Sequence, residues 1–192
     1  MNDSAQALLI IDVQNEYFTG KLPVSYPPGS LANITKAQAF ANARGIPVIV
    51  IQHGSAAPDA KTFIPGSDAW QLHPEIAQSK YSVVFHKTLP NSFHGTALDS
   101  WLKEHRIKSI VISGYMTQMC CDTTARAAFH RGYKVVFLAD ATGTLTLKNA
   151  AGEVTAENLH KTILIVQQSR FSTVINTENW IKDAEKLNGQ IL

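Results

Sequence analysis

The chain has 192 residues, a length that predicts one domain, spanning residues 1–192, with a single sizeable core. Hydrophobic residues make up 45% of the chain and charged residues 17%, which excludes an intrinsically disordered protein. The net charge of +2 is spread along the sequence, which argues against a nucleic-acid-binding protein, and no apolar run reaches the roughly 18 residues that a membrane span needs.

The first residues and the cysteine content favour a cytoplasmic protein. Residues 1–6 are polar and lack the basic and apolar regions of a signal peptide. The two cysteines, Cys120 and Cys121, are adjacent, so their Cα atoms lie about 3.8 Å apart, below the range of about 4.4 Å and more that disulfides prefer. We therefore expect free thiols in a reducing, cytoplasmic setting.

Short apolar runs rich in β-branched residues alternate with helical patterns along the chain. The runs that predict strands are 7–13, 46–51, 81–85, 108–113, 133–139 and, more weakly, 172–175. The patterns that predict helices are 30–43, 96–105, 119–131, 155–168 and 177–187. Continuous apolar strands are typical of parallel sheets that are buried on both faces. The sequence therefore predicts an α/β fold, a Rossmann-like three-layer α/β/α sandwich with a mostly parallel sheet of about six strands.

Two long connections, 53–80 and 141–154, interrupt this alternation. Loops of this length in a single domain are commonly functional or mobile. In open parallel sheets, ligands bind beyond the carboxyl ends of the strands. The side chains that follow the predicted strands are therefore the first candidates for a functional site.

Asp12 and Lys87 both stand at the ends of predicted strands. A carboxylate within an apolar strand is unfavourable unless it is paired, and Asp12 is either a general base that faces the crevice or an aspartate that caps the next turn. Lys87 either pairs with Asp12, stabilises a nearby thiolate by its charge, or is a solvated surface residue. The residue types alone leave these alternatives open.

Cys120 lies where a predicted strand leads into a helix. Gly114 permits a tight turn there, and Thr117 is expected to cap the helix, which places Cys120 in the first turn. At that position the helix dipole favours a thiolate, and free backbone N–H groups can hold an oxyanion. Such a strand–turn–helix is the geometry of a nucleophile elbow, with a buried structural cysteine as the alternative.

Three segments resemble, in order, the motifs of the isochorismatase-like cysteine hydrolase superfamily, which includes nicotinamidases, N-carbamoylsarcosine amidohydrolases and isochorismate hydrolases. The segments are LLIIDVQNEYF, KTLPNSFHGTALDSWL and VISGYMTQMCCDTTARAAFHRGYKVVFLADA. They are spread over residues 8–141 in the order that the family has them, and the ordered set is highly specific.

The resemblance implies a catalytic triad of Asp12, Lys87 and Cys120, in which Asp12 takes the thiol proton and Lys87 stabilises the charged pair. It also implies a cis peptide bond between Tyr115 and Met116, with the backbone amides of Met116 and Cys120 forming an oxyanion hole. The family forms dimers and tetramers, so a homodimer or homotetramer is expected.

The second strand departs from the nicotinamidase pattern. Nicotinamidases bind a metal through an Asp-x-His pair and a further histidine, but Ile51 stands here two residues before His53, where that aspartate would be. The seven histidines show no zinc-ligand spacing, so we expect no metal and no cofactor. The other side chains expected to line the substrate pocket, with core packing as the alternative for the aromatic ones, are Gln14, Phe18, Trp70, Phe93, Tyr115 and Gln118, beside His53.

The function implied is hydrolysis of an amide, carbamoyl or similar C–N bond of a small molecule by the Cys120 thiolate. The alternative is cleavage of an isochorismate-type vinyl ether in the same pocket. A nucleotide-binding module is disfavoured because Asp12 is followed by Val13 and Gln14 rather than by a glycine-rich phosphate loop. A non-catalytic relative is disfavoured because all three triad residues are present.

The two cysteines are expected to face different ways, because successive helical residues differ by about 100° around the helix axis. Cys121 shares an apolar stripe with Ala125, Ala128 and Phe129, which predicts that it packs onto the sheet. Cys120 is then the thiol that faces the crevice.

Overall fold

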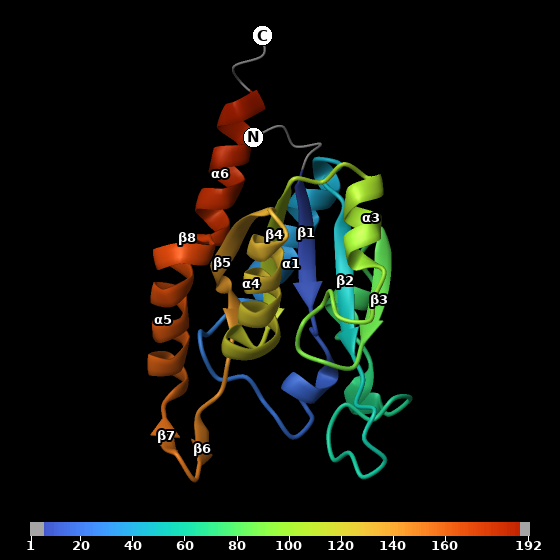
Figure 1. The fold of residues 1–192 in the computed structure, drawn as a ribbon, viewed down its shortest axis with the longest axis vertical. Coiled ribbons are helices and arrows are strands. Elements are labelled where there is room, and N and C mark those ends of the chain that lie inside the picture. The colour runs from blue at the N-terminus through green and yellow to red at the C-terminus, as the bar shows by residue number, and fades with distance from the viewer. Residues whose placement is uncertain (1–5, 189–192) are drawn as a thin grey trace.

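The computed structural model describes residues 6–188, and its central element is a sheet of six parallel strands (Figure 1). Across the sheet the strands lie in the order β3 (Val83–Lys87), β2 (Val48–His53), β1 (Gln6–Ile11), β4 (Ser109–Tyr115), β5 (Lys134–Gly143) and β8 (Thr173–Ile175). The chain builds β1 to β3 outward in one direction and then returns to place β4 on the other side of β1. This reversal places the switch point of the sheet between β1 and β4, and open α/β sheets commonly bind ligands beyond the carboxyl ends of the strands at such a point.

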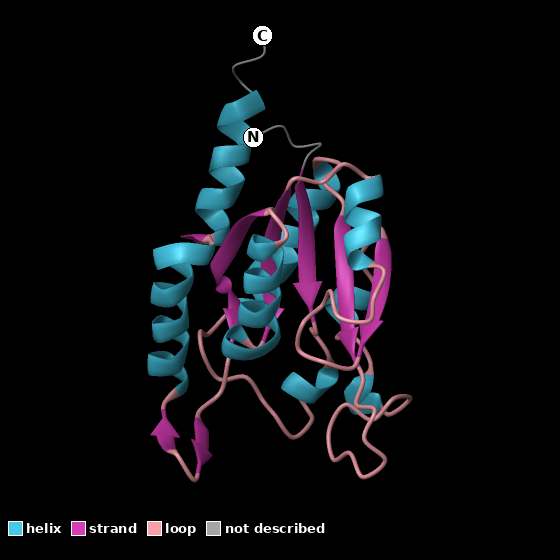
Figure 2. Ribbon diagram, in the orientation of Figure 1, coloured by secondary structure: helices cyan, strands magenta, loops and turns pink. Residues whose placement is uncertain are grey.

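Helices cover both faces of the sheet and complete the three layers (Figures 1 and 2). α1 (Ser30–Ala43) and α6 (Thr177–Asn188) pack together on one face, and α3 (Leu98–Glu104) and α4 (Asp122–His130) lie on the other. α5 (Ala156–Val166) lies beside the start of α4. Short helices fill the connections: η2 (Asn15–Tyr17), η3 (Asp68–Trp70) and α2 (Pro74–Ala77). Within residues 6–188, no helix is both long and apolar enough to cross a membrane.

The strands are apolar throughout because alternate side chains enter two separate cores. Leu8 and Ile10 of β1 belong to the core that includes Ile34 of α1. Leu9 belongs to the opposite core with Leu98 of α3. Full burial of each such side chain contributes about 1.5–3 kcal/mol, so this double burial fixes β1 in the centre of the sheet.

The predicted architecture of three layers and a mostly parallel six-stranded sheet is confirmed. The strand β1 begins one residue earlier and ends two residues earlier than predicted, whereas the other strands of this sheet begin one or two residues later. Three features lie outside the prediction. The segment 141–154 contains a hairpin of β6 (Leu147–Asn149) and β7 (Gly152–Val154). The expected helices 119–131 and 155–168 adjoin π-helical turns, η4 (Thr117–Cys121) and η5 (Gln167–Phe171). Hydrophobic periodicity identifies a helix but not the widened turn at its end.

The long connection after β2 is fastened to the segment that follows β1. The backbone N–H of Asn15 donates to the carbonyl of Gln71, and that of His73 donates to the carbonyl of Val13. The backbone N–H of Phe63 donates to the buried carboxylate of Glu16. These bonds hold the base of the connection over the carboxyl edge of the sheet.

Gly114 permits the close approach of β4 to the end of β1. It pairs with Ile11, the residue before Asp12, and its φ is +111°. A Cβ at this position would lie 2.0 Å from the carbonyl oxygen of Ile11, a distance that no side chain tolerates. Glycine is therefore required where the segments that carry Asp12 and Cys120 come together.

Gly114→Ala is expected to destabilise the protein well beyond the cost of a left-handed backbone alone. Gly132→Ala is the matched control, because Gly132 has φ +86° but no atom within 4 Å of a built Cβ. The control should lose about 1–2 kcal/mol in the free energy of unfolding, and Gly114→Ala at least twice the control's loss. Urea denaturation measures both, and equal losses would contradict the steric argument.

Candidate active site

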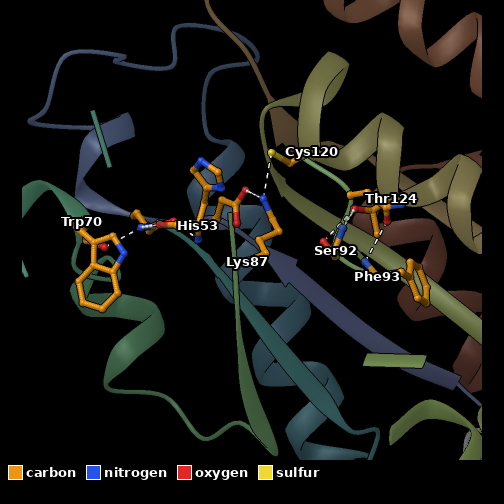
Figure 3. Close-up of polar contacts among 10 residues, drawn as sticks. His53, Trp70, Lys87, Ser92, Phe93, Cys120 and Thr124 are labelled. Carbon is orange, nitrogen blue, oxygen red and sulfur yellow. Dashed lines mark hydrogen bonds and ion pairs between the residues drawn. The ribbon is translucent and has the colours of Figure 1, made fainter. Parts of the chain in front are cut away.

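Asp12, Lys87 and Cys120 meet at the carboxyl edge of the sheet (Figure 3). Asp12 comes directly after β1, Lys87 is the last residue of β3, and Cys120 lies in the turn that follows β4. They are far apart in the sequence, and the parallel sheet brings them together because its strand ends share one edge.

Lys87 joins the other two residues. Its Nζ donates to Asp12 Oδ2 at 2.7 Å and to Cys120 Sγ at 3.2 Å. The side chains of Lys87 and Asp12 are fully buried, and Cys120 is 5% exposed. Among the described residues, Asp12 Oδ1 has no hydrogen-bond partner, which leaves one carboxylate oxygen free to accept a proton. Lys87 is therefore paired with Asp12 in the protein interior and is not a solvated surface residue.

The electrostatics of the cluster keep Lys87 charged and the resting thiol protonated. Burial alone would lower the pKa of Lys87, but the charge of Asp12 and the hydrogen bonds to Asp12 and Cys120 outweigh it and raise that pKa above its ordinary value. Burial raises the pKa of Cys120, Asp12 adds to the rise, and Lys87 only partly opposes it. The helix start and the lysine each favour a thiolate, but in this geometry burial and the nearby carboxylate outweigh them and raise the pKa of Cys120.

The turn that carries Cys120 differs from a simple capped helix. The residue at its N-terminus is Met116, whose backbone is extended, and no side chain caps it. The predicted capping role of Thr117 is wrong, because its hydroxyl is bonded instead to Nδ1 of His160 at 2.8 Å. The peptide bond between Tyr115 and Met116 is cis, as the resemblance implied.

A cavity of about 400 Å³ opens beside Lys87. Among the described residues, its lining consists of Gly54, Ser55, Pro65, Trp70, His86, Lys87, Thr88, His94 and Gly95. The indole of Trp70 and the imidazole of His86 stack with 6.0 Å between ring centroids. Of the predicted pocket residues, Trp70 thus lines this cavity next to a proposed catalytic side chain.

His53 and Gln118 lie near the cluster without lining this cavity. Figure 3 shows the imidazole of His53 beside Lys87. Its Nδ1 is buried and has no partner among the described residues, and the same holds for Oε1 of Gln118. Burial lowers the pKa of His53, and the charge of Lys87 lowers it further, so the imidazole is neutral near pH 7.

Gln14 does not line the cavity but binds the backbone of two segments beside it. Its side-chain amide donates to the carbonyls of His53 and Trp70, and its carbonyl accepts from the backbone N–H of His53. The residue is fully buried. Gln14 therefore ties the end of β1 to the end of β2 and to η3.

Three of the aromatic residues predicted to line the pocket do not line the cavity beside Lys87. Phe93 is 6% exposed and stacks on Tyr133 at 6.1 Å, on the side of Ser92 away from Lys87 (Figure 3). Tyr115 is 1% exposed, and its hydroxyl is hydrogen-bonded to Ser30. Phe18 is half-buried and packs edge-on against Tyr115. An aromatic residue near a strand end is suited either to core packing or to a pocket wall, and the sequence does not distinguish these two roles.

His86, Thr88 and His94 are lining residues that were not among the predicted pocket residues. His86 and Thr88 flank Lys87, so their positions at a strand end were the available signal. His94 belongs to the second matched motif but follows Phe93, which packs inward. Which neighbour of a motif residue turns toward the cavity depends on loop geometry that the sequence pattern does not encode.

The nicotinamidase metal set has no counterpart in the part of the chain that the structure describes. Ile51 replaces the aspartate and is fully buried in the core. Between residues 6 and 188, no group of three or more histidine, cysteine, aspartate or glutamate side chains could hold a metal ion. The residues present thus do not fit a bound metal.

Comparison with known proteins places the chain in a family. Residues 6–179 match the Isochorismatase domain, so the chain belongs to the isochorismatase family of hydrolases and is an enzyme. The isochorismatase family protein YddQ of Bacillus subtilis (strain 168) is 33% identical over 177 residues, covering 92% of this chain and 98% of the relative. The ureidoacrylate amidohydrolase RutB of Pseudomonas syringae pv. syringae (strain B728a) is 30% identical over 176 residues, covering 74% and 72%.

The fold is shared with solved structures. A crystal structure of a Burkholderia xenovorans LB400 protein superposes with a TM-score of 0.92 at 41% identity, covering 95% of this chain and 88% of the other.

The pairing of Asp12 with Lys87 is expected to appear as coupled losses of stability. Asp12→Asn or Lys87→Met alone leaves a buried charge without its partner and should lower the free energy of unfolding by about 3–5 kcal/mol. The double variant removes both charges and should lose clearly less than the sum of the single losses.

A double-mutant cycle by chemical denaturation measures this coupling. The exposed i,i+4 pair of Lys103 and Asp99 is the control, with an expected coupling of about 0.5 kcal/mol or less. Additive losses at Asp12 and Lys87 would contradict a buried ion pair.

Iodoacetamide is expected to modify Cys120 before Cys121, since Cys120 is 5% exposed and Cys121 is fully buried. Because its pKa lies above the ordinary 9.0, the thiolate fraction of Cys120 is small at neutral pH and grows as pH rises. The alkylation rate should therefore climb through the alkaline range without levelling off near neutrality.

Mass spectrometry of the singly labelled protein locates the label. Cys121→Val should leave the rate almost unchanged, because one small apolar group replaces another. A first label on Cys121, or a rate that is constant from neutral pH upward, would show that the cluster is arranged differently.

Proposed function

We propose that this protein hydrolyses a C–N bond of a small amide, ureido or carbamoyl compound, with Cys120 as nucleophile, Asp12 as general base and Lys87 as the charge that holds the two together. One observation carries this proposal: a buried ammonium group bridges a carboxylate at 2.7 Å and a thiol at 3.2 Å at the carboxyl edge of the sheet. The relative named as an amidohydrolase supports the choice of a C–N bond.

The reaction begins with proton transfer from Cys120 Sγ to the unpartnered Oδ1 of Asp12. The sulfur attacks the substrate carbonyl, a C–S bond forms, and the tetrahedral intermediate carries its negative charge on oxygen. Collapse of this intermediate breaks the C–N bond, and the departing nitrogen takes the proton from Asp12. Asp12 then takes a proton from a water molecule, which attacks the thioester carbonyl. The C–S bond breaks, and Asp12 gives the proton to the departing sulfur.

The raised pKa of Cys120 fits this order of events. The thiol stays protonated until a carbonyl is in place, and removal of its proton by Asp12 accompanies the attack. Lys87 remains charged throughout because the negative charge of the cluster raises its pKa. The positive charge stabilises whichever partner, carboxylate or thiolate, is negative at each stage.

We place the oxyanion hole at the backbone N–H groups of Met116 and Cys120. Cys120 lies within the first turn that follows the extended Met116, where helical N–H groups have no intrahelical acceptor. Each donor of this kind contributes about 10²–10³-fold in rate.

The substrate is small and carries polar groups. A cavity of about 400 Å³ holds a molecule of modest size. Nε1 of Trp70, a residue that lines this cavity, is buried and without a partner in the described part of the chain, so it is available to bind the substrate. A buried polar group without a partner costs about 1–3 kcal/mol, which a polar substrate would recover.

A panel of small amides, ureido and carbamoyl compounds and isochorismate, assayed for ammonia and for pyruvate, tests the proposal. We expect ammonia from at least one C–N substrate and a loss of about 10²–10⁴-fold in turnover for Asp12→Asn. Cys120→Ala should abolish turnover, and Cys121→Ala should not. Pyruvate release alone, retained in Cys120→Ala, would instead identify vinyl ether cleavage.

Removal of metal ions is expected to leave the activity unchanged, because no metal-ligand set accompanies the cluster in residues 6–188. The measurement is ammonia release after treatment with a chelator, with a metal-dependent amidohydrolase as positive control. Lost activity that zinc or manganese restores would overturn this expectation.

A further inference from the structure

The turn that carries Cys120 is held at both ends by one face of α5 and the turn η5 that continues it. At the first residue of η4, the hydroxyl of Thr117 is bonded to Nδ1 of His160 at 2.8 Å. Immediately after η4, Oδ1 of Asp122 accepts from Nε2 of Gln167 at 2.7 Å. His160 and Gln167 are seven residues apart, two helical turns, and so lie on the same face.

The two held residues are also joined directly. The backbone N–H of Asp122 donates to the carbonyl of Thr117 across the widened π-helical turn. Cys120 lies inside this loop of hydrogen bonds. Its position relative to Lys87 therefore depends on where His160 and Gln167 hold the two ends.

His160 is suited to hold Thr117 in one orientation. It is 3% exposed, and its Nε2 is 3.0 Å from the carbonyl of Ala139 in β5. A carbonyl only accepts, so Nε2 carries the proton and Nδ1 accepts from the Thr117 hydroxyl. The imidazole thus links the sheet to the nucleophile turn with both nitrogens used.

The contact between Gln167 and Asp122 is also fixed in one orientation by further hydrogen bonds. Gln167 is fully buried, and its Oε1 accepts from the hydroxyl of Ser172 at 2.6 Å, which orients the amide toward Asp122. The other carboxylate oxygen of Asp122 accepts from Nε of Arg126 at 2.8 Å. Within the described residues, the side-chain hydrogen bonds of His160, Gln167 and Asp122 go to partners other than Asp12 and Lys87.

We propose that His160 and Gln167 are positioning residues, which through Thr117 and Asp122 set the place of the Cys120 sulfur and of the backbone amides beside it. This inference rests on the proposed function, since it assigns the two residues to the same nucleophile. Misplacement of a reacting group by about 1 Å can cost about 10²-fold in rate, so a contact outside the cavity can govern turnover.

Near-isosteric variants test the proposal, because His160→Ala would bury unpartnered groups and endanger folding. Thr117→Val and Gln167→Met should each lower kcat by about 10–100-fold with little change in KM, since they displace the nucleophile but leave the cavity intact. Thr117→Ser retains the hydroxyl and should restore most of kcat. Thr162→Val, which removes an exposed hydroxyl on α5, is the matched control and should retain wild-type kcat.

A readout without substrate separates this proposal from the proposed function. The pH profile of Cys120 alkylation should shift in Thr117→Val and Gln167→Met, because the sulfur moves relative to Asp12 and Lys87, and stay unchanged in Thr162→Val. Inactivity of the wild-type enzyme on every amide, with shifted profiles in both variants, would overturn the reaction and support the positioning. Variants that lose melting temperature but keep wild-type kcat and alkylation profiles would overturn the positioning.

Discussion

The ion pair between Lys87 and Asp12 is the interaction on which the site depends. Two opposite charges are removed from water at the carboxyl edge of the sheet, and their desolvation is tolerable only because each has the other at 2.7 Å. The pair lies across the ends of β1 and β3, with β2 between them. Correct register of three strands is therefore a condition for pairing, and a slip would leave a buried charge unpaired.

The thiol adds a constraint of a different kind. Cys120 is held against the same ammonium group, but burial and the carboxylate keep its proton in place. A site arranged in this way holds little reactive thiolate in the absence of substrate. In the proposed reaction, the nucleophile forms when Asp12 accepts the thiol proton and a carbonyl is present to receive the sulfur, which limits side reactions of the resting thiol.

The fold and the candidate positions of Asp12 and Lys87 could be predicted from the sequence for a physical reason, whereas the grouping of these two residues with Cys120 was implied by the family resemblance. Strands buried on both faces leave a continuous apolar run, and charged residues at the ends of such runs are conspicuous, as with Asp12 and Lys87. The lining of the cavity was less predictable. Phe93 and Trp70 are both aromatic residues in loops, and the sequence does not distinguish their roles. Phe93 packs on Tyr133 and Trp70 lines the cavity, because the loop conformation determines the direction of each side chain. The hydrogen bond between Thr117 and His160 could not be predicted either, because the two residues are 43 positions apart in the sequence and no local pattern links them.

The hydrogen bonds made by Gln14 fix the two ends of the arm 54–69 independently of the conformation of the arm between them. One buried amide holds the backbone of His53 and Trp70, so the arm of residues 54–69 between them is pinned at both ends to the strand that presents Asp12. Residues Ala56, Ala57, Pro58 and Asp59 within that arm are exposed and contribute nothing to either core. The same arm supplies Gly54, Ser55 and Pro65 to the lining of the cavity. Because this wall and the cluster of Asp12, Lys87 and Cys120 lie on different segments, the exposed part of the arm can change in sequence without moving the cluster.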